Sequence, residues 1–224
     1  MDAALNYCKR FSLLAKEEAA KTADAKRRDE LLAMSEMFAH LMEGKAQNFY
    51  EAVETVYLTH LLMMIESNGH SFSFGRFDQY VWPFYEADIN SGKISKEKAL
   101  EILTHFFIMT NSLNKVRPWG HTQYSGGYPL YSNLMVGGMK PDGTDGTNDL
   151  SYLSLEAMAL TGLPEPNLSV RFSKDTPHSL MQDSAKLIRK GFGMPSIFCD
   201  EVVIPAMMTL GLTEEVAREY ASMG

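Results

Sequence analysis

Cysteine is scarce in this chain, and its scarcity excludes one class of protein. Only Cys8 and Cys199 occur among the 224 residues, too few for the disulfide framework of a small secreted domain. We therefore expect a reducing compartment and a cytoplasmic protein. Cys199 falls in a largely apolar strand expected at 196–203, with no histidine close in sequence. This is the usual setting of a buried, inert thiol rather than of a nucleophile.

Basic residues and long apolar runs are also lacking. The chain carries 21 Lys and Arg against 28 Asp and Glu, a formal net charge of −7, whereas a nucleic-acid surface needs clustered positive charge. The basic run at 26–28 is flanked by acidic residues and is interpreted as a solvated helix face. No stretch approaches the roughly 20 apolar residues that span a bilayer, and Asp2, Lys9 and Arg10 interrupt any signal peptide. We expect neither nucleic acid nor membrane as a partner.

Patterns that bind metals or nucleotides are missing as well. The six histidines show no ligand-like spacing. The acidic segment at 141–149 lacks the repeated Asp and the distal Glu of a calcium loop, so its Asp-Gly pairs are interpreted as a surface turn. The glycines of 124–138 do not follow phosphate-loop or dinucleotide spacing. We expect no bound metal ion and no nucleotide.

Helical periodicity dominates the first half of the chain. Apolar residues recur at helical spacing at 31–41, 49–64 and 100–107, and each segment follows a capping signal, which for the first is Asp24. This pattern predicts a mainly helical region over residues 1–115.

The sequence pattern changes after Pro118. Short β-like runs at 132–136 and 167–172 are bounded by Gly and Pro, and helices are expected between and after them. Residues 116–224 are therefore predicted to form strand–helix units, which gives an α/β protein with a mostly covered sheet. No repeat or linker marks a boundary, so 1–224 is taken as one continuous piece.

Candidate binding residues first gather at 66–80. A histidine, several hydroxyls, an arginine and an aspartate lie in and around a segment bounded by two glycines, just after an apolar helix. Loops held by a rigid scaffold are where binding groups concentrate. From the residues alone, His70 is more often structural than functional. Arg76 and Asp78 are most simply interpreted as a local ion pair or as side chains that stabilise the turn.

A second candidate stretch lies at 124–138. Tyr128 and Tyr131 bracket the start of an expected strand, and from the residues alone they are two half-buried aromatics.

Several ordered motifs resemble the glycyl radical enzyme family of the pyruvate formate-lyase type. The first stretch is similar to the Asn-Gly-His-Ser and Gly-Arg-Phe-Asp-Gln-Tyr signature of its B12-independent glycerol and propanediol dehydratase branch. The second resembles the family's Gly-Gly-Tyr-Pro-x-Tyr-x-Asn-Leu motif, and 164–171 and 193–206 match further family segments. The resemblance covers nearly the whole chain. At Cys199 the family generally has Asn, so that position is a departure.

The resemblance implies a fold and a set of site residues. The family fold is a ten-stranded barrel of two half-barrels wrapped by helices, of which this chain would supply a helical layer and part of the first half-barrel. His70 and Ser71 would contact substrate hydroxyls, and Tyr131 would line the pocket. The cysteine that becomes the thiyl radical would directly follow Gly224. No catalytic residue is therefore expected within the chain, which would be an inactive internal piece of such an enzyme.

The resemblance also implies a reaction and partners. The intact enzyme would eliminate water, or another leaving group, from a small hydroxylated substrate by radical hydrogen abstraction. Its glycyl radical would lie outside this chain and be installed by a radical-SAM activase, with no cofactor bound directly here. The remainder of the barrel and, in a homodimer, a second copy would be the other partners. Alternatives are a formate C-acetyltransferase-type enzyme, an eliminase acting on choline, hydroxyproline or a sulfonate, and a non-catalytic truncated remnant.

Overall fold

Four short strands make a parallel sheet whose order follows the chain. The computed structural model describes residues 2–67, 71–113, 115, 117–124 and 130–221. Within these residues the sheet order is β1-β2-β3-β4, with each neighbouring pair parallel. The strands are β1 (Gly75–Arg76), β2 (Asn133–Gly137), β3 (Asn167–Phe172) and β4 (Ser196–Cys199). Because the strands are parallel, all their amino ends lie along one edge of the sheet.

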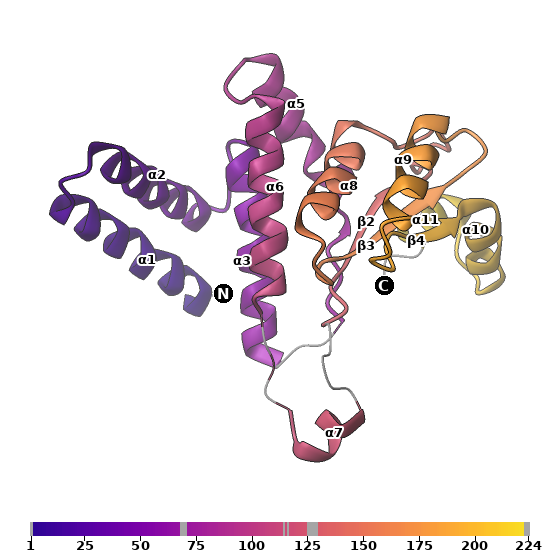
Figure 1. Ribbon diagram of the computed structural model, residues 1–224, viewed down its shortest axis with the longest axis horizontal. Coiled ribbons are helices and arrows are strands. Elements are labelled where there is room, and N and C mark those ends of the chain that lie inside the picture. The colour runs from indigo at the N-terminus through magenta and orange to yellow at the C-terminus, as the bar shows by residue number, and fades with distance from the viewer. Residues whose placement is uncertain (1, 68–70, 114, 116, 125–129, 222–224) are drawn as a thin grey trace.

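The part of the chain before β2 is built mainly from helices (Figure 1). They are α1 (Asp2–Lys21), α2 (Ala25–Met42), α3 (Phe49–Ser67), α4 (Phe77–Tyr80), α5 (Trp82–Asn90), α6 (Lys96–Asn111) and α7 (Trp119–Tyr124). The helices predicted at 31–41, 49–64 and 100–107 are confirmed by α2, α3 and α6. Asp24 and Ser95 begin two of them, because their side chains accept hydrogen bonds from first-turn amides that have no partner within the helix.

The remaining helices lie between and after the later strands. They are α8 (Asp149–Thr161), α9 (His178–Ile188), α10 (Asp200–Thr209) and α11 (Glu214–Tyr220). In Figure 1, α3, α6, α8 and α9 follow one another, and each packs on the next. Since α8 also packs on β2 and β3, these helices form a layer against the sheet. The predicted α/β class is confirmed.

The main core lies where the helical layer meets the sheet. Phe77 and Phe106 stack with ring centroids 5.4 Å apart, and Phe106 makes an edge contact with Phe74 at 5.0 Å. Leu134 of β2 and Leu168 of β3 add fully buried side chains to the same cluster. Because Phe74 and Phe77 flank β1, the core fixes both this strand and the segment that leads into it.

The strand predicted at 196–203 is shorter than expected. β4 ends at Cys199 and α10 begins at Asp200, because Asp200 and Glu201 place two carboxylates in a first helical turn, where they favour the helix dipole. The prediction of a buried Cys199 is also wrong. Its thiol is exposed at the edge of the described sheet and donates to Glu201 Oε2 at 3.3 Å.

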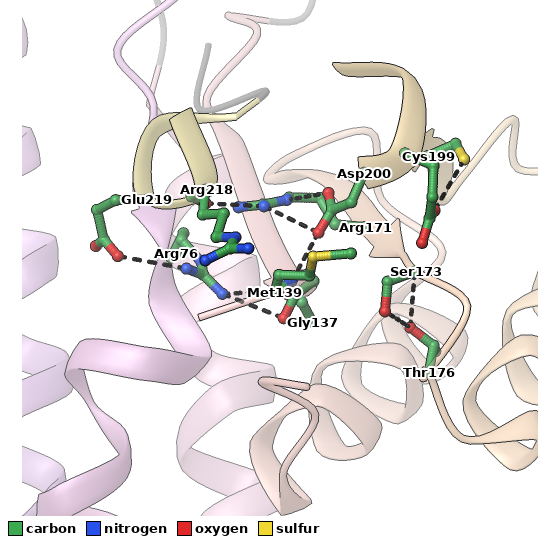
Figure 2. A network of polar contacts seen from close by, with 12 residues as sticks. Arg76, Gly137, Met139, Arg171, Ser173, Thr176, Cys199, Asp200, Arg218 and Glu219 are labelled. Atoms are coloured by element: carbon green, nitrogen blue, oxygen red, sulfur yellow. Dashed lines mark hydrogen bonds and ion pairs between the residues drawn. The ribbon is translucent and has the colours of Figure 1, made fainter. Parts of the chain in front are cut away.

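A buried network of charged side chains lies at the carboxyl ends of the strands (Figure 2). Arg171, near the end of β3, donates to Asp200 through Nε at 2.7 Å and Nη2 at 3.0 Å, and both side chains are fully buried. Asp200 Oδ2 also accepts from Met139 N at 2.6 Å, and Arg171 Nη2 donates to Arg218 O at 2.8 Å. The network therefore joins β3 to the start of α10 and to α11.

Arg76 and Asp78 do not form the local ion pair that was the first of the two interpretations of the sequence. Arg76 Nη2 donates to the carbonyls of Gly137 and Gly138 at 3.2 and 3.4 Å, and Nη1 lies 3.4 Å from Glu219 Oε2 on α11. Asp78 is fully buried and accepts from Gly137 N at 2.8 Å. Burial raises the pKa of the Asp78 carboxyl, opposed by the hydrogen bonds that it accepts. Asp78 also accepts from Ser151 Oγ of α8 and from Gln79 Nε2, so the two side chains join the end of β2 to its neighbours. Arg76 Nε has no hydrogen-bond partner among the described residues.

Gly138 provides the space that this network needs. Its φ is +79°, and a Cβ at this position would lie 2.6 Å from Arg171 Nε and 2.7 Å from Arg171 Cβ. Such distances are far below van der Waals contact, and the backbone conformation favours glycine. The turn after β2 therefore packs directly on the Arg171 side chain.

Removing one partner of the buried ion pair should strongly destabilise the protein. Arg171→Met leaves the buried Asp200 carboxyl without its counter-ion, and breaking a buried pair in this way typically costs about 3–5 kcal/mol. Urea unfolding followed by circular dichroism measures the loss. Lys186→Met is the matched control, because it breaks the exposed Lys186–Asp183 pair on α9, and exposed pairs contribute little. Equal unfolding midpoints for the two variants would contradict the assigned role of Arg171.

Candidate substrate-binding site

Three loops meet at the amino ends of β1, β2 and β3. Ser71 N donates to Leu130 O at 2.8 Å, which joins the loop before β1 to the loop before β2. Phe74 N then donates to Asn133 O at 2.7 Å, and the third loop is attached by Asn167 N, which donates to Ser132 O at 3.1 Å. These bonds continue the pairing of the sheet beyond its strands and hold the loops in fixed register.

Ser71 and Tyr131 share an unusual backbone conformation. Their φ values are 60° and 55°, and no other described residue except glycine has a positive φ. Residues with a Cβ adopt this left-handed region at a cost of order 1–3 kcal/mol, and such residues cluster at functional sites where the surroundings hold them. Both are residues that the resemblance assigns to substrate binding, and the Ser71–Leu130 bond brings their loops together. Ser71 is exposed, and Tyr131 is 43% exposed.

Glu165 holds the loop that contains Tyr131. Its carboxylate accepts from Tyr131 N at 2.6 Å and from Ser132 N at 3.0 Å, although the residue is only 3% exposed. Burial raises the pKa of the Glu165 carboxyl, opposed by the backbone amides that donate to it. The carboxylate therefore fixes two consecutive amides of a single turn.

His60 supports the same turn from α3. Its Nε2 lies 3.2 Å from Ser132 Oγ, and its ring packs on Phe74 with centroids 4.4 Å apart. Burial lowers the pKa of His60 from its ordinary 6.5 to about 4, so the imidazole is neutral at pH 7. A cavity of about 240 Å³ lies beside it, between α3 and the segment 72–74, with Tyr80 on its wall.

Not every predicted site residue can be placed. His70, Tyr128 and Gly224 lie outside the described residues. Glu165 and His60 were not identified as candidates from sequence, although Glu165 belongs to the Pro-Glu-Pro segment of the family resemblance. The sequence pattern that could have identified Glu165 is a carboxylate between two prolines at the start of a buried strand.

The described residues show neither a metal cluster nor a membrane-spanning helix. Within them, no group of three or more His, Cys, Asp and Glu side chains is arranged to hold a metal ion. Among the helices of those same ranges, none combines the length and apolarity needed to cross a bilayer.

Comparison with known proteins identifies the family. The model of the pyruvate formate lyase-like family matches residues 1–224. The chain belongs to this family. The probable dehydratase YbiW of Escherichia coli K12 is 39% identical over 97% of this chain and 27% of its own length.

Solved structures of the family carry the same fold. The glycerol-bound form of the B12-independent glycerol dehydratase from Clostridium butyricum is 44% identical, with a TM-score of 0.93 over 99% of this chain and 28% of its own. A Roseburia inulinivorans structure concerned with 1,2-propanediol dehydration is 39% identical, with a TM-score of 0.95 over 100% of this chain and 28% of its own. The predicted fold, a helical layer with part of a glycyl radical enzyme barrel, is confirmed. The chain spans just over a quarter of the length of these relatives.

The neutral His60 should make stability fall in mild acid. Its pKa is depressed from 6.5 in the unfolded chain to about 4 in the folded protein, so its contribution is present above pH 6.5 and is lost as the pH falls toward 4. His60→Gln retains a side chain able to bond Ser132 and removes this titration. The free energy of unfolding, measured in urea between pH 7 and 4, should fall less steeply for His60→Gln than for the wild type. A wild-type slope in His60→Gln would contradict the prediction.

Proposed function

We propose that this chain supplies substrate-binding loops of a glycyl radical dehydratase that removes water from a small polyol. The observation that carries the proposal is the hydrogen bond from Ser71 N to Leu130 O. It joins the two loops to which the family resemblance assigns a substrate role through two separate motifs, and both loops contain a left-handed non-glycine residue. The 39–44% identity to proteins described by glycerol binding and by 1,2-propanediol dehydration supports the same substrate class.

The side chains suit a polyol. A serine hydroxyl both donates and accepts, an imidazole can do either, and a phenol adds a flat apolar wall with one polar tip. His70 and Ser71 bind the hydroxyls of the substrate in this proposal, and Tyr131 closes the pocket wall. Orienting a small substrate in this way lowers the entropic part of the barrier.

The reaction itself depends on groups outside residues 1–224. The glycyl radical supplies the hydrogen-abstracting chemistry, and in this proposal a radical-SAM activase installs it. The residues of this chain bind the substrate, orient its hydroxyls and limit the access of water. The proposed assembly is a cytoplasmic homodimer in which the rest of the barrel covers this segment.

Substitutions in the two loops should reduce polyol turnover without reducing the radical. Losing a hydrogen bond to a buried substrate hydroxyl costs about 1–3 kcal/mol, roughly ten- to hundredfold in kcat/KM. We expect this loss for His70→Ala and Ser71→Ala, and a smaller loss for Tyr131→Phe than for Tyr131→Ala, because the ring also supplies shape. The measurement uses residues 1–224 in place of the matching segment of the Clostridium butyricum glycerol dehydratase, activated anaerobically.

Three quantities are recorded on the same samples: the melting temperature, the electron paramagnetic resonance spin count, and the turnover of glycerol and 1,2-propanediol. Ser67→Ala is the matched control, because Ser67 is exposed at the end of α3 and its hydroxyl bonds Met63 O of its own helix. Parallel loss of all three quantities in the loop variants would mean that these residues support the scaffold only. Turnover of choline, hydroxyproline or a sulfonate instead of a polyol would overturn the substrate class.

A further inference from the structure

We infer that Glu165 is a positioning residue, which holds Tyr131 in its left-handed turn and thereby sets the direction of the phenol from a loop that is bonded to the loop of Ser71. The effect on catalysis rests on the proposed function, whereas the effect on the turn does not. The inference extends the site from the residues that touch the substrate to a carboxylate behind them.

The first step is the geometry of the two amides. In an extended strand, successive N–H groups point in opposite directions, so one carboxylate cannot bind both. A left-handed residue turns neighbouring amides toward one side and makes a small anion-binding concavity. At Tyr131, with φ of 55°, this allows Glu165 Oε1 to bind Tyr131 N at 2.6 Å and Oε2 to bind Ser132 N at 3.0 Å. The conformation and the carboxylate therefore require each other.

The second step concerns the charge of Glu165. No Lys, Arg or His of the described residues forms an ion pair with its buried carboxylate. The groups that stabilise the charged form are backbone amides, those of Ser132, Tyr131, Leu130 and Asn167. A buried charge without a counter-ion is unfavourable unless its hydrogen bonds are well made. Nearly all of its stabilisation thus depends on this turn and on the start of β3.

The third step leads from the turn to the other loop. Leu130, directly before Tyr131, accepts the hydrogen bond from Ser71 N, and Ser132, directly after it, contacts His60. Glu165 is in turn held by its position between Pro164 and Pro166 at the entrance of β3, since proline restricts the backbone. A change at Glu165 should therefore displace Tyr131 and Ser71 together while leaving the strands in place.

Hydrogen exchange of the chain tests the clamp directly. Glu165→Gln keeps the size of the side chain but offers one acceptor oxygen where two amides need one each. We expect the amides of Tyr131 and Ser132 to exchange at least about tenfold faster in this variant, with Val136 N of β2 unchanged. Glu156→Gln is the matched control, because Glu156 is exposed on α8. Unchanged exchange at Tyr131 and Ser132 would overturn the inference.

A thermodynamic cycle with Tyr131→Gly separates clamping from general support. Glycine adopts a left-handed backbone at little cost, so the turn then needs less help from Glu165. The shift of the urea midpoint caused by Glu165→Gln should be smaller in the Tyr131→Gly background than in the wild type. Equal shifts in the two backgrounds would mean that Glu165 stabilises the fold without acting through Tyr131.

Kinetics in the hybrid dehydratase test the catalytic consequence. Glu165→Gln should raise the KM for 1,2-propanediol about tenfold at an unchanged spin count, and should add little to the loss already caused by Tyr131→Ala. A full additional loss in the Tyr131→Ala background, or a lowered spin count, would overturn the positioning role. If Tyr131→Ala and Ser71→Ala leave diol kinetics unchanged, the proposed function fails, while hydrogen exchange still decides on the clamp.

Discussion

The buried ion pair between Arg171 and Asp200 is the contact on which the carboxyl side of the molecule depends. Water cannot reach either charge, so each needs a partner from the protein, and each has further hydrogen bonds to the backbone. These partners come from β3, from the start of α10, from the turn after β2 and from α11. Displacing any one of the four would remove a hydrogen bond from a buried charged group, so the network couples these segments to one another.

β3 carries buried charges of opposite sign at its two ends. Glu165, two residues before its first residue, is bonded by amides of the loops, whereas Arg171, near its last, is bonded to the Asp200 carboxylate and to a carbonyl of α11. Between them, the strand pairs with β2 from Asn167 to Arg171 and with β4 from Ser169 to Phe172. The carboxyl edge therefore anchors the helices that follow, and the amino edge is left to present the loops that carry Ser71 and Tyr131.

Much of the fold could be predicted from the sequence, because long helices and bounded strands leave periodic patterns. The apolar spacing at 49–64 gave α3, and the β-like run at 167–172 coincides with β3. β1 was missed because a strand of two residues has no period. The start of α10 was missed because the apolar residues of 196–203 outweighed the two acidic residues that lie in the first turn of a helix there.

The candidate site was predictable only in part, and for a different reason. Ser71 and Tyr131 were named through family motifs, and their left-handed backbones could not be foreseen, since neither is glycine or asparagine. Glu165 and His60 were missed because their partners lie 34 and 72 residues away in sequence. Hydrogen bonds of this kind join a side chain to a distant backbone or hydroxyl group and leave no local pattern. Such contacts become visible only once the strands are aligned.

The close approach of Gly138 to Arg171 links two positions that sequence comparison would treat as separate. A side chain at 138 would occupy the space of the Arg171 guanidinium, and a displaced guanidinium would leave Asp200 without its counter-ion. An uncharged methyl group at position 138 would thus have the same effect as replacing the charged Arg171, which lies 33 residues further along the chain (171 − 138). A side chain at position 138 therefore requires a compensating change at position 171.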